Sequence, residues 1–271
     1  RISWTSKLER EWKDKVIKEL KARKVEILVN YLPVGSQKAT EFWAEICLET
    51  GISFVNCIPV FIASDPAWEQ RFIDAGIPIV GDDMRSQFGA SIVSQMLQEL
   101  AFERGHHVKA HIQRNVGGNT DFLNMEDKNR LASKKISKEN VIRAQNEIRG
   151  ISTDDSFLHA GPSEYIHFYG DNKVANFRLE LEGFGGSPVL FDAQLSVQDS
   201  PNSGGVVIDA IRYLKVAREL GVVGALRGPS AFTQKTPPEQ MMFSDAIYEC
   251  TELANRRLTK STSSQMNKIK A

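Results

Sequence analysis

The chain has 271 residues, of which 41% are hydrophobic and 25% are charged, a composition typical of a globular protein with a substantial core. Lysine plus arginine and aspartate plus glutamate each number 34, so the net charge is zero, which argues against nucleic acid and anionic membrane surfaces as partners. No apolar run approaches the roughly 20 residues that cross a bilayer, and the charged first residues do not resemble a signal peptide. Three cysteines without a CxxC pair favour reduced thiols and predict a cytoplasmic protein.

Helical and strand patterns alternate through the first 80 residues. Apolar residues spaced three and four apart indicate amphipathic helices, the second of them running from a cap at Ser36 to Gly51. Short apolar runs such as "ISFVNCIPV" indicate buried strands. The predicted elements, helix and strand in turn, cover residues 8–23, 25–34, 36–51, 52–60, 65–76 and 77–80. Short connections between such elements predict a parallel sheet covered by helices.

The next elements are a helix and a strand. Ser86 is a suitable N-cap and Gly105 a suitable stop for the helix. Its predicted apolar face consists of Ile92, Val93, Met96, Leu97 and Leu100. The strand is predicted at residues 108–113.

The pattern changes after residue 170. Apolar and polar residues alternate strictly over residues 174–182 and again over 189–197, with "GGSP" between them, which predicts an antiparallel hairpin with one covered face. A long helix follows, with Ser200 as its expected cap and Pro201 as its first residue. The last 13 residues contain few apolar side chains, so we expect them to be frayed.

Two neighbouring segments have the residue types of a ligand site. "NVGGNTDFLN" combines Gly117 and Gly118, which permit positive φ and close approach of a ligand, with amide and carboxylate groups suited to sugar hydroxyls. An ordinary turn explains this composition equally well. In "SKKISK", Lys134 and Lys138 are four residues apart and share a face if the segment is helical. A solvated helix face is the simpler interpretation of such lysines taken alone.

Four shorter motifs lie where strands and helices are expected to meet. "GDDMRS" and "QDSPNSGG" place aspartate and serine at predicted helix starts, where unpaired amides favour anions. In the first motif, capping alone explains one aspartate but not two aspartates and a serine. In the second, it explains Ser200 and leaves Asp199 without a role. "GDNK" and "QKTPP" place single lysines in a turn and in a rigid segment, where a surface role is the default. The five histidines lack the spacing of a metal site.

These motifs, in this order, resemble the myo-inositol-1-phosphate synthase family of archaeal and bacterial type. The resemblance covers residues 24–238 and rests on "VNYLPVGS", "GDDMRSQFGAS", "QRNVGGNTDFLNM", "RLASKKISK", "GDNKVA", "DSPNSGGVVIDAIR" and "KTPP". It implies an α/β fold, a Rossmann-type doubly wound parallel sheet with an inserted α+β catalytic and oligomerisation domain. It also implies tightly bound NAD and conversion of D-glucose 6-phosphate to 1L-myo-inositol 1-phosphate, an isomerisation in inositol and phospholipid biosynthesis. The steps are oxidation, enolisation, intramolecular aldol closure and re-reduction.

The resemblance also implies a domain division and an assembly. Residues 1–82 would be the remainder of the NAD-binding domain, residues 83–190 the inserted domain, and residues 191–271 the return to the NAD-binding domain. Because the chain opens on a helix and has no GxGxxG near its start, we expect the first βαβ unit to be missing. The expected assembly is a homotetramer.

Site residues follow from the same motifs. The resemblance implies catalytic roles for Lys134, Lys138, Lys173 and Lys235. It implies substrate binding by Asn115, Asn119, Asp121 and Ser200. It implies cofactor binding by Asn30, Ser36, Asn56, Asp83, Ser86, Asp171 and Asp199. Lysines suit this chemistry because negative charge develops on oxygen as the ring closes.

Three functions remain open on sequence grounds: a working synthase, a non-catalytic relative that binds NAD or a sugar phosphate, and a dehydrogenase with net redox chemistry. Retention of four candidate lysines favours the first. The sequence does not distinguish a divalent from a monovalent metal ion, and it does not identify the lysine that removes the proton at C6.

Overall fold

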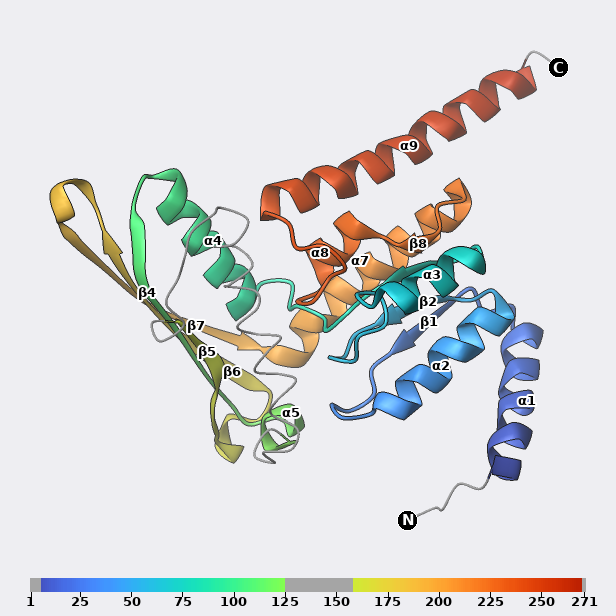
Figure 1. The fold of residues 1–271 in the computed structure, drawn as a ribbon, viewed down its shortest axis with the longest axis horizontal. Helices are drawn as coiled ribbons and strands as arrows, with labels where there is room; N and C mark the ends of the chain where they lie inside the picture. The colour runs from blue at the N-terminus through green and yellow to red at the C-terminus, as the bar shows by residue number, and fades with distance from the viewer. Residues whose placement is uncertain (1–5, 125–157, 270–271) are drawn as a thin grey trace.

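The computed structural model describes residues 6–124 and 158–269, which form two sheets with helices packed against them (Figure 1). The strands are β1 (Ile27–Asn30), β2 (Ser53–Asn56), β3 (Pro78–Val80), β4 (His107–Gly117), β5 (Leu158–Tyr165), β6 (Asn172–Glu182), β7 (Pro188–Gln198) and β8 (Gly224–Ala225). The helices are α1 (Ser6–Ala22), α2 (Gln37–Thr50), α3 (Pro66–Asp74), α4 (Ala90–Glu103), α5 (Thr120–Asn124), α7 (Asp199–Leu220), α8 (Arg227–Thr233) and α9 (Phe243–Ile269). Two short 3-10 turns lie at His167–Tyr169 and Phe184–Gly186.

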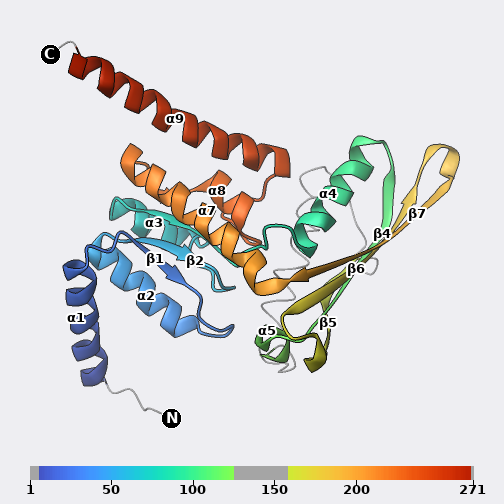
Figure 2. The same ribbon diagram turned by 180° about the vertical axis from the view of Figure 1, so that it is seen from behind.

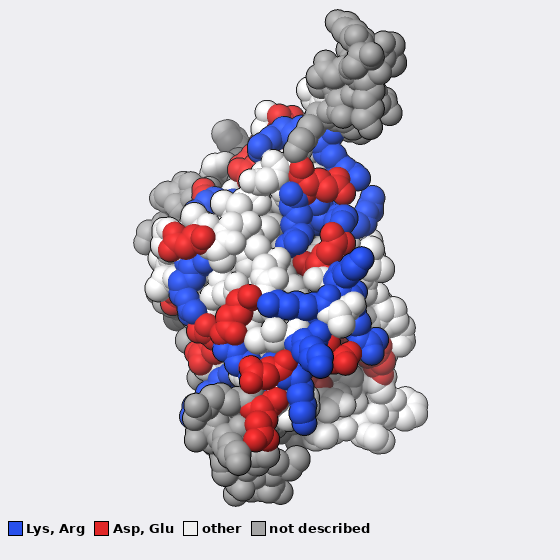
Figure 3. Space-filling view, turned by 90° about the vertical axis from the view of Figure 1, so that its right-hand side faces the viewer, with Lys and Arg blue, Asp and Glu red and all other residues white. Residues whose placement is uncertain are grey.

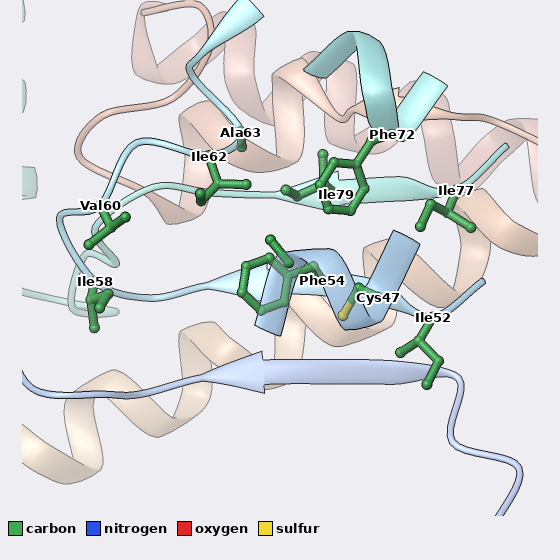
Figure 4. Close-up of a cluster of buried hydrophobic side chains, with 11 residues drawn as sticks. Cys47, Ile52, Phe54, Ile58, Val60, Ile62, Ala63, Phe72, Ile77 and Ile79 are labelled. Carbon is green, nitrogen blue, oxygen red and sulfur yellow. The ribbon is translucent and has the colours of Figure 1, made fainter. Parts of the chain in front are cut away.

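The first sheet is parallel, in the order β1-β2-β3-β8, and is covered on both faces. Neighbouring residues on β2 point to opposite sides because side chains alternate along a strand. Phe54 packs with α2 and α3, in the cluster shown in Figure 4, whereas Val55 packs with α7. This arrangement confirms the predicted α/β class with a Rossmann-like parallel sheet.

The second sheet has the order β5-β4-β6-β7, and β6 and β7 form the predicted antiparallel hairpin. Ala175, Phe177 and Leu179 are buried against α4, while Arg178 and Glu180 on the same strand face outward. The two sheets lie beside each other, with α4 packed on the second sheet and α7 on the first (Figures 1 and 2). The predicted alternation therefore identified the covered face of β6 correctly. On β7 it was right for Ala193 and Leu195, which pack against the buried residues of α4 and β6, whereas Val189 and Phe191 on the same predicted face are 40% and 38% exposed.

Helix α4 differs from the prediction at both its start and its buried face. It begins at Ala90 after Gly89, not at Ser86, because backbone hydrogen bonds from Arg85 to Thr233 and from Gln87 to Asn202 hold the preceding segment in a non-helical course. Met96 and Leu100, expected to be buried, are 41% and 59% exposed. The buried side of α4 includes a polar set instead, composed of Ser94, Gln95, Gln98 and Glu99.

Two further helix ends were predicted incorrectly. Helix α7 begins at Asp199, and the hydroxyl of Ser200 donates to Asp171 at 2.6 Å instead of capping the helix. The segment expected to be frayed continues α9 to Ile269, which projects from the body of the molecule (Figure 1). Ser36 precedes α2 as expected but makes no side-chain capping bond, whereas Gly51 adopts the left-handed conformation that ends the helix.

The division into three sequence segments stays a prediction. Strand β7 pairs with β6 along its whole length, from Pro188 to Gln198, so pairing favours a last boundary near residue 198 over one at residue 190. On the face shown in Figure 3, acidic and basic side chains are interspersed. None of the helices in the described ranges is long and apolar enough to cross a membrane.

Candidate active site

A cleft of about 390 Å³ lies where the carboxyl ends of the parallel strands meet the second sheet. Its walls include the loops that follow β1, β2 and β3, the start of α4, the end of β4, and the start of α7. Ligands of open parallel sheets bind at the carboxyl ends of the strands, because helix starts and loops gather there. Nine of the predicted site residues line this cleft: Asp83, Ser86, Asn115, Asn119, Asp121, Lys173, Asp199, Ser200 and Lys235.

Lys173 is held on one side of the cleft by the start of α7. Its Nζ lies 3.1 Å from Oδ1 of Asp199, and the two side chains are 20% and 17% exposed. The other carboxylate oxygen of Asp199 accepts from Nδ2 of Asn119 at 3.1 Å. Partial burial weakens screening by water, so this pair fixes the ammonium group more firmly than a surface pair would.

Lys235 forms a second pair at the cleft, with Nζ 2.9 Å from Oδ1 of Asp83. The backbone N–H of Lys235 also donates to the carbonyl of Asp83 at 2.7 Å, so the two residues are joined by main chain and side chain. Asp83 is 5% exposed and has a positive φ of 59°, a strained conformation for a residue that is not glycine. Such strain is frequent where a side chain is held for function.

Close packing within the protein requires glycine at positions 117 and 118. Neither Gly117 nor Gly118 has positive φ, so the predicted conformational reason was wrong. A Cβ on Gly118 would lie 2.4 Å from the carbonyl oxygen of Ile166, and one on Gly117 would lie 2.6 Å from the ring of Phe122. These contacts bring the loop against the second sheet and leave Asn119 facing the cleft.

Asn119 and Asp171 join the loop to α7. The Oδ1 of Asn119 accepts from the backbone N–H groups of Asp121 and Phe122 at 3.1 and 3.3 Å, while its Nδ2 donates to Asp199. Asp171 accepts from both the backbone N–H and the hydroxyl of Ser200, at 3.0 and 2.6 Å. Asp171 therefore positions the start of α7 beneath the cleft and is not itself among the lining residues.

Three residues predicted to bind a cofactor lie elsewhere. Asn30 and Asn56 are 3% and 0% exposed and bond to each other at 2.8 Å, and neither they nor Ser36 line the cleft. Asn56 also donates to Oδ1 of the fully buried Asp82 at 2.7 Å. This geometry favours a role in tying the ends of the first three strands together.

Asp82 organises the loop after β2. Its carboxylate accepts from the backbone N–H groups of Ile62, Ala63 and Ser64 and from the hydroxyl of Ser64, at 2.8 to 3.2 Å. Burial raises the pKa of Asp82 to about 6, and the hydrogen bonds oppose that rise. The carboxylate is thus ionised at neutral pH and holds one wall of the cleft.

The sequence reasoning overlooked several polar residues at the cleft. Arg85 is 2% exposed, its Nη1 donates to Gln95 at 2.6 Å, and burial lowers its pKa to about 10. Gln113 and Tyr31 line the cleft as well, and burial raises the pKa of Tyr31. One signal was available: polar residues at positions 111, 113 and 115 alternate along β4 and so share a face.

Lys134 and Lys138 lie outside the described residues, so their positions relative to the cleft stay a prediction. Among the residues that are described, no group of three or more His, Cys, Asp or Glu is placed to hold a metal ion. Cys57 lines the cleft, but burial, together with Asp83 and Asp82, raises the pKa of its thiol to about 12. It is therefore a thiol and not a reactive thiolate at neutral pH.

The arrangement can act on a polyhydroxylated anion. The two ammonium groups that line the cleft can stabilise negative charge on oxygen, and the amides and carboxylates that line it with them can bind hydroxyl groups.

The chain is similar to known proteins in sequence and in fold. Residues 89–200 match the family described as Myo-inositol-1-phosphate synthase. The chain is 48% identical over 226 residues to an inositol-3-phosphate synthase of Mycobacterium tuberculosis, and the match covers 83% of this chain and 61% of that protein. It is 46% identical over 228 residues to an inositol-3-phosphate synthase of Corynebacterium glutamicum, covering 83% and 63%.

A solved structure shares the fold. The myo-inositol-1-phosphate synthase-related protein of Thermotoga maritima has a TM-score of 0.72 and 25% identity, covering 91% of this chain and 70% of that one. The chain spans a little over three fifths of the length of the two curated relatives. On these grounds the chain belongs to the myo-inositol-1-phosphate synthase family.

Proposed function

We propose that this protein catalyses the NAD-dependent conversion of D-glucose 6-phosphate to 1L-myo-inositol 1-phosphate. The observation that carries the proposal is the convergence of two ammonium–carboxylate pairs, Lys173–Asp199 and Lys235–Asp83, on one cleft. The four residues come from separate parts of the chain. Ion pairs that serve only to stabilise a fold do not have to lie at the same cleft.

The chemistry of the cleft fits the nicotinamide nucleoside end of NAD. Hydroxyl and carboxylate groups suit ribose hydroxyls and a carboxamide. Asp83 and Ser86 present such groups after the parallel strand β3, and Asp199 presents one at the start of α7. We assign these three residues to that end of the cofactor. When bound, NAD would supply the hydride acceptor for a sugar hydroxyl and later return the hydride.

The protein residues would act on the sugar. Asn115, Asn119 and Asp121 would bind the hydroxyl groups of the open chain so that its two ends approach each other, an effect that can contribute several kcal/mol. Lys173 and Lys235 would stabilise the oxyanions formed during enolisation and ring closure. Lys134 and Lys138 are, with these two lysines, candidates for the base that removes the proton at C6.

The test is incubation of the protein with glucose 6-phosphate and NAD, followed by chromatographic assay of inositol phosphate. We expect product without net accumulation of NADH. Bound NAD with no product would favour the non-catalytic relative, and NADH that accumulates with turnover would favour a net dehydrogenase.

A homotetramer in the cytoplasm belongs to the same proposal. Large apolar side chains are exposed on and around the β6–β7 hairpin, including Phe184, Leu190 and Phe191, and would be covered by association with other copies. Sedimentation velocity tests the assembly. The buried, unpaired cysteines support a reducing compartment.

A further inference from the structure

Four buried polar side chains connect the interior of the α4–β4 layer to the cleft. Nε2 of His111 lies 3.1 Å from Oγ of Ser94, which donates to Oε1 of Gln113 at 2.7 Å. Nε2 of Gln113 then donates to Oδ1 of Asn115 at 3.0 Å. All four are at most 3% exposed, and Gln113 and Asn115 line the cleft.

The direction of this chain follows from its inner end. Nδ1 of His111 is buried and has no hydrogen-bond partner among the described residues. A buried N–H without an acceptor costs about 1–3 kcal/mol, so the hydrogen is favoured on Nε2, which has Ser94 as its acceptor. Burial also lowers the pKa of His111 to about 4, so the ring is neutral at physiological pH.

Each group then donates to the next one toward the cleft. The hydroxyl oxygen of Ser94 accepts the hydrogen bond from His111, so the hydroxyl group donates its own hydrogen to the side-chain oxygen of Gln113. The amide nitrogen of Gln113 is left to donate to Asn115. The opposite tautomer of His111 would reverse every bond and turn the oxygen of Asn115 away from Gln113.

We propose that His111, Ser94 and Gln113 are positioning residues that fix the side-chain amide of Asn115, so that its NH2 group, and not its oxygen, meets a sugar oxygen in the cleft. An NH2 group has two hydrogens, so it can serve a ligand oxygen in addition to a protein acceptor. The sugar as ligand rests on the proposed function, whereas the direction of the chain does not. The oxygen and the NH2 group of an asparagine side chain are similar in size, so packing alone does not choose between them. The direction of the hydrogen-bond chain does, and it keeps the side-chain oxygen of Asn115 from facing an oxygen of the sugar.

The direction is tested by the tautomer of His111 in the intact protein. Histidine-selective ¹⁵N labelling with NMR distinguishes protonated from unprotonated ring nitrogens, and a His111→Gln variant assigns the signal. We expect protonated Nε2 and unprotonated Nδ1 between about pH 5.5 and 8. The Nδ1-protonated tautomer would overturn the proposal. This measurement requires neither substrate nor turnover.

The positioning role is tested by a double-mutant cycle on turnover of glucose 6-phosphate. Ser94→Ala should lower kcat/KM by about threefold to tenfold, the value of one hydrogen bond, and should have little further effect when Asn115 is already alanine. Ser196→Ala removes an exposed hydroxyl on β7 and should leave kcat/KM unchanged. A loss from Ser94→Ala of equal size in both backgrounds would contradict action through Asn115. If the unaltered protein gives no product, the proposed function fails, and the tautomer still decides the direction of the chain.

Discussion

Replacement of Asp199 by asparagine tests the pair that holds Lys173. Opposite charges 3.1 Å apart attract by about 5 kcal/mol at an effective dielectric constant of about 20, before lost hydration is subtracted. Exposed pairs contribute about 0.2–1 kcal/mol net and breaking buried pairs costs about 3–5 kcal/mol. Exposures of 20% and 17% place this pair between the two, at about 2 kcal/mol. Loss of a negative charge in the first turn of α7 adds about 0.5 kcal/mol.

We therefore expect Asp199→Asn to lower the free energy of unfolding by about 2–3 kcal/mol in urea titration. Because the ammonium group of Lys173 is then less well held, kcat/KM for glucose 6-phosphate should fall by about tenfold to a hundredfold. Asp209→Asn is the matched control, since it breaks an ion pair on the same helix with Arg212, which is 76% exposed. Its effect on the free energy of unfolding should stay below about 1 kcal/mol, with normal turnover. Equal behaviour of the two variants in both assays would refute the role given to Asp199.

Three further predictions concern other parts of the cleft. Lys235→Met should lower the free energy of unfolding by about 3 kcal/mol in urea titration, because it removes the ammonium group that pairs with the buried carboxylate of Asp83. Lys235→Arg keeps a positive charge and should retain most of the stability. Equal losses of stability in the two variants would contradict this pairing. Burial raises the pKa of Asp82 from 3.8 to about 6, so the folded state binds the proton of this carboxyl group more tightly than the unfolded state does. The protonated group therefore contributes about 3 kcal/mol to the free energy of unfolding below pH 3.8, and this contribution is lost as the pH rises to about 6. An Asp82→Asn variant should lack that pH dependence in urea titrations, and retention of it would assign the titration to another group. Gly118→Ala should lower the melting temperature and abolish turnover, because the added Cβ would lie 2.4 Å from a backbone oxygen. Gly204→Ala is the control and should raise the melting temperature, because position 204 lies inside α7 with open space around it. A higher melting temperature for Gly118→Ala than for Gly204→Ala would show that the loop adapts to the added methyl group.

The local patterns of the sequence were sufficient for most elements of the fold. The apolar run around Phe54 and the alternation around Phe177 predicted a parallel sheet covered on both faces and a hairpin covered on one. These patterns work because side-chain direction repeats every two residues in a strand, whatever the rest of the chain does. The family resemblance implied that Lys173 and Asp199 belong to one site, and their side chains form an ion pair of 3.1 Å at the cleft.

Features that depend on partners distant in the sequence could not be predicted. The start of α4 is set by backbone bonds to residues near 202 and 233, so Ser86 resembles a cap yet faces the cleft. Asn56 has the residue type of a ligand group, but its amide is fully used by neighbours that only folding supplies. The type of a polar residue does not indicate whether its side chain will form hydrogen bonds with the protein or with a ligand.

The amino-acid sequence by itself therefore determined the two kinds of sheet, the family resemblance and nine of the residues that line the cleft, because these depend on local periodicity and on residue type. Only the tertiary structure decided that Lys235 pairs with Asp83, that Asn30 is sealed from the cleft, and that His111 lies at the inner end of a hydrogen-bond chain. The physical reason is that charge pairing, burial and hydrogen-bond direction are properties of neighbours in space, and the neighbours of these residues lie far away along the chain or on a different element.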